Sequence, residues 1–120
     1  LDSYGWTRKG SPVRVMSFSY VALNRVKKLA PELDVVMLVD RLYSWQLTKN
    51  LARGDWIAGP GIDLLRENPR FARDVQRSGR RVHVWTVNSL QDIDLCVDLG
   101  AEAIITDTPA VALRHLRGRV

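Results

Sequence analysis

The amino-acid sequence predicts an α/β fold with a mainly parallel β-sheet. Short β-branched or apolar runs alternate with amphipathic segments, and helix-capping residues separate the two. The run from Val35 to Val39 is wholly apolar, which is typical of a strand buried on both faces of a parallel sheet. The length of 120 residues fits one domain or part of one.

Five strand-then-helix units follow one another along the chain. The expected strands cover residues 13–18, 35–39, 56–59, 82–87 and 103–106. The helices that follow them are expected to begin at residues 19, 44, 69, 89 and 109.

Local signals place the first two helices. Ser19 is a suitable N-cap for the first helix, and Pro31 ends it. Gly54 follows the second helix, at a position that often needs a left-handed backbone. The first helix is expected to turn one apolar face to the core, made of Ala22, Leu23, Val26, Leu29 and Ala30.

The later helices carry stronger signals. Asn68 and Pro69 stand in the preferred N-cap and first-turn order, and Gly79 follows their helix. Residues 89–92 (SLQD) have the spacing of a capping box, and Gly100 closes the helix that they open. The apolar residues expected to contact the core are Leu90, Ile93 and Val97 in this helix, and Val111, Leu113 and Leu116 in the helix that Thr108 and Pro109 start.

Two architectures fit five such units. A (β/α)8 barrel of about 250 residues uses units of this size, so the chain would supply roughly its second half. An open doubly wound sheet also fits the length, but it usually carries a glycine-rich phosphate loop, and residues 59–61 (GPG) do not match one. The pattern favours the barrel and leaves the open sheet as the alternative.

Composition excludes several classes of protein. The net charge of +5 comes from basic residues spread along the chain without a nucleic-acid-binding motif, so no nucleic-acid partner is expected. No apolar run approaches the roughly 18 residues of a membrane span, so no transmembrane segment is expected. Cys96 is the single cysteine, which favours a reducing compartment, and we expect a cytoplasmic location.

Three motifs, in order, resemble the glycerophosphodiester phosphodiesterase family. VHVWTVN (82–88) and LGAEAIITDTP (99–109) are similar to the C-terminal signature of the family, and VMSFS (15–19) is similar to its middle. The resemblance implies that residues 1–120 are the C-terminal part of a single barrel domain, from the fourth to the eighth strand, with the N-terminal part absent from this chain. It also implies hydrolysis of glycerophosphodiesters to glycerol 3-phosphate and an alcohol, with a divalent cation, calcium or magnesium.

The sequence does not carry the full set of motifs that the resemblance associates with catalysis. The catalytic histidines and the metal-binding carboxylates of the family belong to HR, ENT and ExD motifs on early strands. The sequence has no HR and no ENT, and its one ExD triplet, Glu32–Leu33–Asp34, stands without them just before the second expected strand. His83 is expected to be a packed or hydrogen-bonded barrel histidine, and His115 a surface histidine. The sequence therefore predicts no catalytic residue and no metal ligand in this chain. The expected partners are a small-molecule glycerophosphodiester and either the missing half of the barrel or a second copy; the alternative is a non-catalytic phosphate-binding or interaction module.

The chain is still expected to supply part of the substrate cleft. Barrel enzymes place their active sites at the C-terminal ends of the strands. The expected substrate-binding residues are Ser17, Phe18, Trp85 and Asn88, with packing as the alternative for Ser17 and Phe18. Trp85 is expected to pack on a glycerol or alcohol group, with core packing as the alternative, and Asn88 to bind a hydroxyl or to fix its loop.

Two other kinds of residue are given structural roles. Asp107 is expected to organise the entry to the last helix, because helix N-termini favour acidic groups. Trp45 and Trp56 are expected to cover the outer layer of the barrel.

Overall fold

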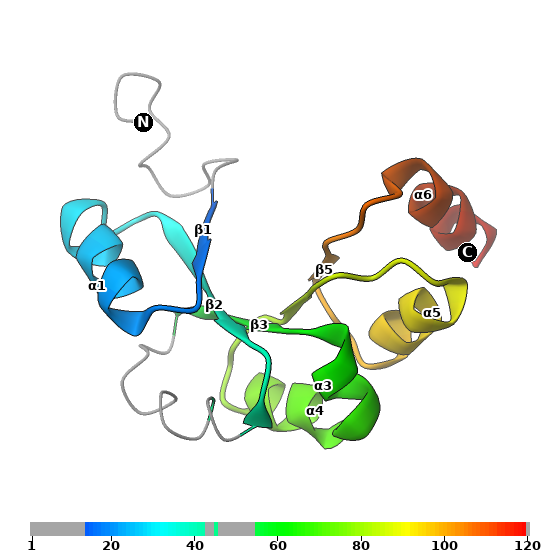
Figure 1. Ribbon diagram of the computed structural model, residues 1–120, viewed down its shortest axis with the longest axis horizontal. Coiled ribbons are helices and arrows are strands. Elements are labelled where there is room, and N and C mark those ends of the chain that lie inside the picture. The colour runs from blue at the N-terminus through cyan, green and yellow to red at the C-terminus, as the bar shows by residue number, and fades with distance from the viewer. Residues whose placement is uncertain (1–13, 43–44, 46–54, 120) are drawn as a thin grey trace.

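The parallel strands lie side by side in the order in which they occur in the chain (Figure 1). A computed structural model describes residues 14–42, 45 and 55–119. Its strands are β1 (Arg14–Ser17), β2 (Asp34–Val39), β3 (Ile57–Pro60), β4 (His83–Val84) and β5 (Ala103–Ile104). Parallel bridges from Ala58 to Val82 and from Gly61 to Trp85 join β3 to β4. A doubly wound sheet reverses its strand order at a switch point, and the described strands show no reversal.

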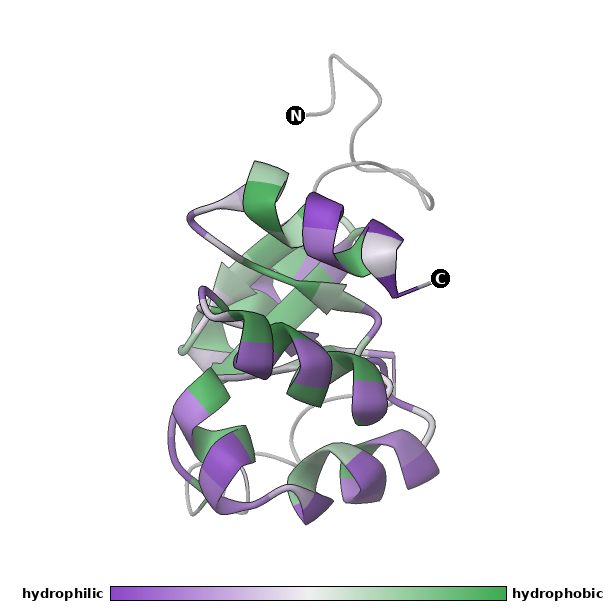
Figure 2. Ribbon diagram, turned by 90° about the vertical axis from the view of Figure 1, so that its right-hand side faces the viewer, coloured by the Kyte–Doolittle hydropathy of each residue, from purple (hydrophilic) through white to green (hydrophobic). Residues whose placement is uncertain are grey.

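Helices follow the strands and lie around their outer side (Figure 1). They are α1 (Tyr20–Leu29), α3 (Ile62–Glu67), α4 (Arg70–Arg77), α5 (Leu90–Asp98) and α6 (Pro109–Gly118). The strands are largely hydrophobic, whereas the helices carry many hydrophilic residues (Figure 2). Most of the helix predicted over 44–53 lies outside the described residues. None of the helices in the described part of the chain has the length and hydropathy needed to cross a bilayer.

The capping signals at Ser19, Ser89 and Gly100 are confirmed. Ser19 Oγ accepts a hydrogen bond from Ala22 N at 3.2 Å, and Ser89 Oγ accepts one from Asp92 N at 3.1 Å. Gly100 has a φ of 77°, in the left-handed region that favours glycine, as expected for a residue that ends a helix. Asn68 is not the N-cap of α4, which is Pro69, and Thr108 at the N-cap of α6 makes no side-chain capping bond.

Strand alternation gives the sheet two different faces. Val35, Met37 and Val39 belong to the core cluster between the sheet and the helices, which also contains Trp45 and Trp56 as expected. The intervening β2 residues point to the other face of the sheet. We call it the free face, because no described helix lies on it (Figure 1). There a Cβ on Gly59 would lie 2.6 Å from Val36 Cγ1, so the close approach of β3 to β2 requires glycine.

Ion pairs cross the free face at the beginning of the strands. Arg14 Nε lies 3.4 Å from Asp34 Oδ2, and Arg81 Nη2 lies 3.1 Å from Asp34 Oδ1. Burial opposes ionisation of Asp34, but hydrogen bonds and charge from the two arginines lower its pKa overall. His83 is buried and lies 2.9 Å from Glu102, so the prediction that this histidine is packed and hydrogen-bonded is confirmed.

Several apolar residues predicted to face the core are exposed. Leu29 is 81% exposed, because α1 contacts the sheet through a stripe centred near Leu23 and Leu29 lies about 120° around the helix from it. In α5 the buried stripe runs through Ile93 and Cys96. The other residues whose predicted burial is wrong are Ala22, Leu90, Val97, Val111 and Leu113.

Two element predictions also need correction. Helix α3 is absent from the prediction, because its N-cap residue is Gly61, which has no side chain to form a capping hydrogen bond and so gives no N-cap signal. The strand predicted over 82–87 ends earlier: its last bridge is at Trp85, and Val87 packs in the core beside Val84.

A charged pair joins α3 to α5. Arg66 donates two hydrogen bonds to Asp92, which is 7% exposed, and a third to the exposed Asp63. The hydrogen bonds from Arg66 lower the pKa of Asp92. Cys96, one turn along α5, is buried, and burial together with the charge of Asp92 raises its pKa to about 11.

We expect the Arg66–Asp92 pair to make stability depend on pH. The folded-state pKa of Asp92 is depressed, so the stabilisation is complete above the ordinary carboxyl value of 3.8 and is lost as the pH falls through the folded-state value. Urea unfolding should show Asp92→Asn less stable than the parent at neutral pH, with the difference shrinking below pH 3.8. Asp63→Asn is the matched control and should change little, because exposed ion pairs contribute little. A difference for Asp92→Asn that stays constant with pH would contradict the prediction.

Candidate functional site

All four residues predicted to contact substrate lie at the C-terminal end of the sheet. Ser17 is the last residue of β1 and Phe18 follows it, while Trp85 and Asn88 follow β4. Because every described pairing is parallel, the ends of β1 and β4 lie at the same edge of the sheet.

Phe18 and Trp85 form an aromatic pair across the free face. Their ring centroids are 5.6 Å apart and their planes are 89° apart, an edge-to-face contact. β1 and β4 are separated by two strands, which would place them about 14 Å apart in a flat sheet. The two side chains therefore lean toward each other across the free face, and the Trp85 ring reaches over the end of β3. Phe18 is 53% exposed, so the pair is open to solvent.

The Trp85 ring is held over the end of β3. Its Nε1 donates a hydrogen bond to the carbonyl oxygen of Gly59 at 2.6 Å. Trp85 is half-buried and is not a member of the core cluster that contains Val84 and Val87. The indole thus lies on the free face and not between the sheet and the helices.

Asn88 connects the loop after β4 to the loop after β5. Its Oδ1 accepts hydrogen bonds from Thr106 Oγ1 and from Asp107 N, both at 3.0 Å. Its Nδ2 donates to Asp107 Oδ2 at 3.0 Å. Of the two roles predicted for Asn88, the geometry provides the fixing of the loop. Asp107 contributes to this network at the entry to α6.

Ser17 and Ser19 form the turn between β1 and α1. Ser17 Oγ accepts a hydrogen bond from Ser19 N at 2.9 Å, and Ser19 caps α1. The Ser17 hydroxyl proton is not used in this bond and is able to face a ligand at the end of β1.

Metal-ligating side chains do not gather at this end of the described structure. Across residues 14–42, 45 and 55–119, no three His, Cys, Asp or Glu residues lie close enough together to hold a metal ion. His115 Nε2 lies 2.7 Å from Asp94 Oδ1, so this histidine joins α6 to α5 and is only partly exposed.

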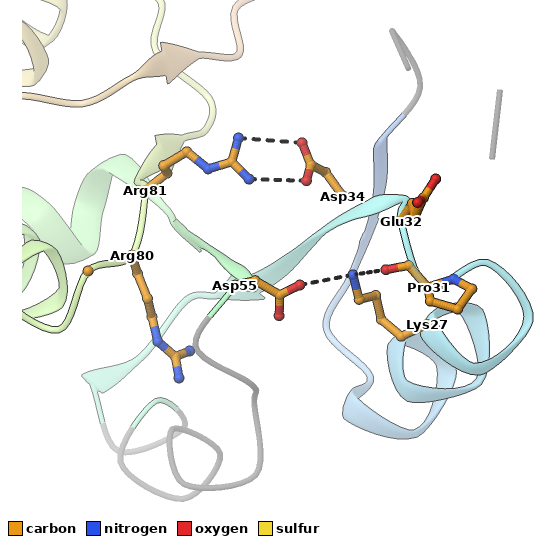
Figure 3. Close-up of a pocket in the computed structure, with 8 residues that line it drawn as sticks. Lys27, Pro31, Glu32, Asp34, Asp55, Arg80 and Arg81 are labelled. Carbon is orange, nitrogen blue, oxygen red and sulfur yellow. Dashed lines mark hydrogen bonds and ion pairs between the residues drawn. The ribbon is translucent and has the colours of Figure 1, made fainter. Parts of the chain in front are cut away.

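A separate cavity lies at the opposite end of the sheet (Figure 3). Its volume is about 430 Å³, and its lining residues precede the strands or end α1: Lys27, Pro31, Glu32, Asp34, Asp55, Gly79, Arg80 and Arg81. Lys27 Nζ donates to the carbonyl oxygens of Pro31 and Leu33 and to Asp55. Arg81 pairs with Asp34. These contacts tie α1 and the loops before the strands to the sheet, a structural role typical of this end of a barrel.

The sequence and fold place the chain in a known family. The profile of the "Glycerophosphoryl diester phosphodiesterase family" matches residues 1–111. The chain belongs to this family. The resemblance seen in the VHVWTVN and LGAEAIITDTP motifs is confirmed.

Relatives and solved structures agree with this assignment. The chain is 34% identical over 95 residues to "Probable glycerophosphodiester phosphodiesterase 1" of Mycobacterium tuberculosis, covering 79% of the chain and 35% of the relative. It matches a glycerophosphodiester phosphodiesterase structure from Parabacteroides distasonis at 26% identity and a TM-score of 0.72, over 87% of the chain and 42% of the other. A phosphodiesterase from Oleispira antarctica, in complex with the product sn-glycerol-3-phosphate, matches in fold at 19% identity and a TM-score of 0.74, over 90% and 43%. The chain thus spans between a third and a half of each of these proteins.

Sequence reasoning missed one part of the site. The segment Gly59–Pro60–Gly61 ends β3 under the Trp85 ring. Two glycines around a proline at a strand end indicate that a side chain or another backbone segment approaches closely. The pattern does not show that this side chain is the Trp85 indole.

We expect Asn88→Ala to loosen the loops after β4 and β5. The substitution removes three hydrogen bonds and should lower stability by about 1 to 2 kcal/mol, since the bonds are exposed. Hydrogen exchange at the Asp107 amide should become faster, because its acceptor is lost. Gln91→Ala, an exposed amide on α5, is the control. Unchanged exchange at Asp107 would contradict the role given to Asn88.

Proposed function

We propose that this chain is the C-terminal part of a (β/α)8 barrel that hydrolyses glycerophosphodiesters to glycerol 3-phosphate and an alcohol, and that it supplies one wall of the substrate cleft. The observation that carries the proposal is the exposed Phe18–Trp85 pair at the C-terminal ends of the strands, in a chain of this family. Barrel enzymes bind their substrates at this end.

The free face supports the barrel architecture. The strands keep their chain order, the rings of Phe18 and Trp85 meet across the free face, and the described helices follow the strands on the other side. Further strands that close the barrel would cover the exposed Met16 and pair with the open edges of β1 and β5. In the proposal these strands come from the N-terminal half of the barrel or from a second copy of the chain.

The catalytic groups are assigned to the N-terminal part of the barrel. A divalent cation, calcium or magnesium, supplies charge stabilisation for phosphoryl oxygens when it is bound. The described residues do not fit such a site, because they bring no three metal-ligating side chains together. We therefore assign no metal ligand and no acid–base residue to the described part of this chain.

The described residues bind and orient the substrate in this proposal. Phe18 and Trp85 offer apolar ring surface to the carbon atoms of the glycerol or alcohol group and exclude water from it. Asn88 holds the loops after β4 and β5 together, so the edge of the cleft keeps its shape. The substrate is a small molecule, and the proposed location is the cytoplasm.

The alternative function, a non-catalytic phosphate-binding module, is not supported by the charged cavity at the beginning of the strands. Lys27 and Arg81, two of its basic groups, are hydrogen-bonded to carboxylates and carbonyl oxygens of the chain itself.

We expect catalysis to require more of the barrel than this chain. The purified 120-residue chain should not hydrolyse glycerophosphocholine with calcium, magnesium or manganese. A chain extended upstream by about 120 to 130 residues, to the barrel length of about 250, should be active with a divalent cation and inactive after chelation. Metal-dependent turnover by the short chain would show that it holds its own catalytic groups.

In the extended enzyme, Trp85→Ala should raise KM more than it lowers kcat. A ring that packs on a non-reacting group makes nearly the same contact in the ground state and the transition state. The loss is expected to be about 1 to 3 kcal/mol, roughly tenfold to a hundredfold in kcat/KM. If Trp85 were only a core residue, the substitution would lower stability by about 3 to 5 kcal/mol and leave KM near normal. Steady-state kinetics and thermal unfolding of the same variant separate the two roles.

A further inference from the structure

We propose that Gly61 is a positioning residue that determines how Trp85 meets the substrate. The proposal rests on the substrate-wall role given to Trp85 above. Gly61 would act through the indole ring and need not touch the substrate itself.

The backbone fixes Trp85 and Gly61 against each other. Trp85 N donates to the carbonyl oxygen of Pro60 at 3.2 Å, and Ile62 N donates to the carbonyl oxygen of Trp85 at 2.6 Å. Gly61 N donates to Val39 on the other side at 2.9 Å. Gly61 is therefore held between β2 and β4, and its bridge partner is Trp85 itself. Because parallel bridge partners point the same way, a side chain on Gly61 would rise directly under the ring.

The space above Gly61 is filled by the indole. A Cβ at this position would lie 3.3 Å from both Cη2 and Cζ2 of Trp85, and 3.7 Å from Cε2. The backbone of Gly61 has a φ of −68° and a ψ of 152°, a conformation that alanine adopts freely. The restriction at Gly61 therefore comes from the ring and not from the backbone.

The same edge of the ring is fixed by a hydrogen bond. Trp85 Nε1 donates to Gly59 O, so the N–H group of the indole is already used. Phe18 contacts the ring edge to face. The indole is left with carbon surface to offer, which suits the CH groups of a glycerol or alcohol and not a phosphate oxygen. A ring lifted by a few tenths of an ångström at Gly61 would strain the bond to Gly59 and tilt this surface.

NMR of the 120-residue chain tests the position of the ring directly. The indole N–H signal of Trp85 is identified by its disappearance in Trp85→Phe. Gly61→Ala should shift this signal and speed its hydrogen exchange, whereas Gly118→Ala, which has nothing within 4 Å of its added Cβ, should leave it unchanged. An unchanged signal in Gly61→Ala would overturn the proposal.

Titration of the upstream-extended enzyme with sn-glycerol 3-phosphate, and separately with inorganic phosphate, tests the effect of Gly61 on substrate binding. Gly61→Ala should weaken binding of sn-glycerol 3-phosphate by about two- to tenfold and leave binding of inorganic phosphate, if any, unchanged. In a Trp85→Phe background it should have little further effect, because phenylalanine lacks the outer indole atoms that approach Gly61. Equal losses in both backgrounds would mean that Gly61 acts through general stability, and would overturn the proposal.

The outcome for the parent chain separates this proposal from the proposed function. If the parent binds sn-glycerol 3-phosphate and Gly61→Ala binds it equally well, the positioning role fails while the substrate wall stands. If sn-glycerol 3-phosphate does not change the Trp85 signal of the parent extended enzyme at any concentration, the substrate wall fails and the positioning role fails with it.

Discussion

The pairing of each strand with the strand before it in the chain, always in parallel, determines the rest of the described structure. A parallel neighbour can be reached only by a crossover, and right-handed crossovers between successive neighbours all fall on the same side of the sheet. The helices therefore cover one face and leave the other free. The same constraint brings the ends of β1, β4 and β5 to one edge, which is how Phe18, Trp85 and Asn88 come to share a site.

The two ends of the free face have different chemistry. Where the strands begin, Asp34 forms ion pairs with Arg14 and Arg81. Glu102 lies between Arg81 and His83 and pairs with both. Where the strands end, aromatic rings stand open. The charged end can be enclosed because its charges are already paired. The aromatic end has no such internal partner for its ring surface, so it is the part of the free face that is suited to a ligand.

The sequence predicts the local features well and the long-range ones less well. Ser19 and Ser89 cap helices through bonds to residues three positions away, so their patterns could be read directly. The exposure of Leu29 could not, because an apolar pattern gives the width of a helix face but not its rotation against the sheet. Motifs singled out Trp85 and Asn88 as candidate site residues. Their contacts depend on Gly59 and Thr106, each brought close by a different crossover, and no local pattern encodes them.

Burial of the lone thiol has a chemical consequence. With the pKa of Cys96 at about 11, only about one molecule in ten thousand carries a thiolate at neutral pH, and even that group is enclosed between α5 and the sheet. Alkylating reagents attack the thiolate, so they react at an ordinary rate only in molecules whose α5 has separated from the strands. The rate at which Cys96 is modified therefore measures how often α5, the helix that also carries Asp92, separates from the sheet.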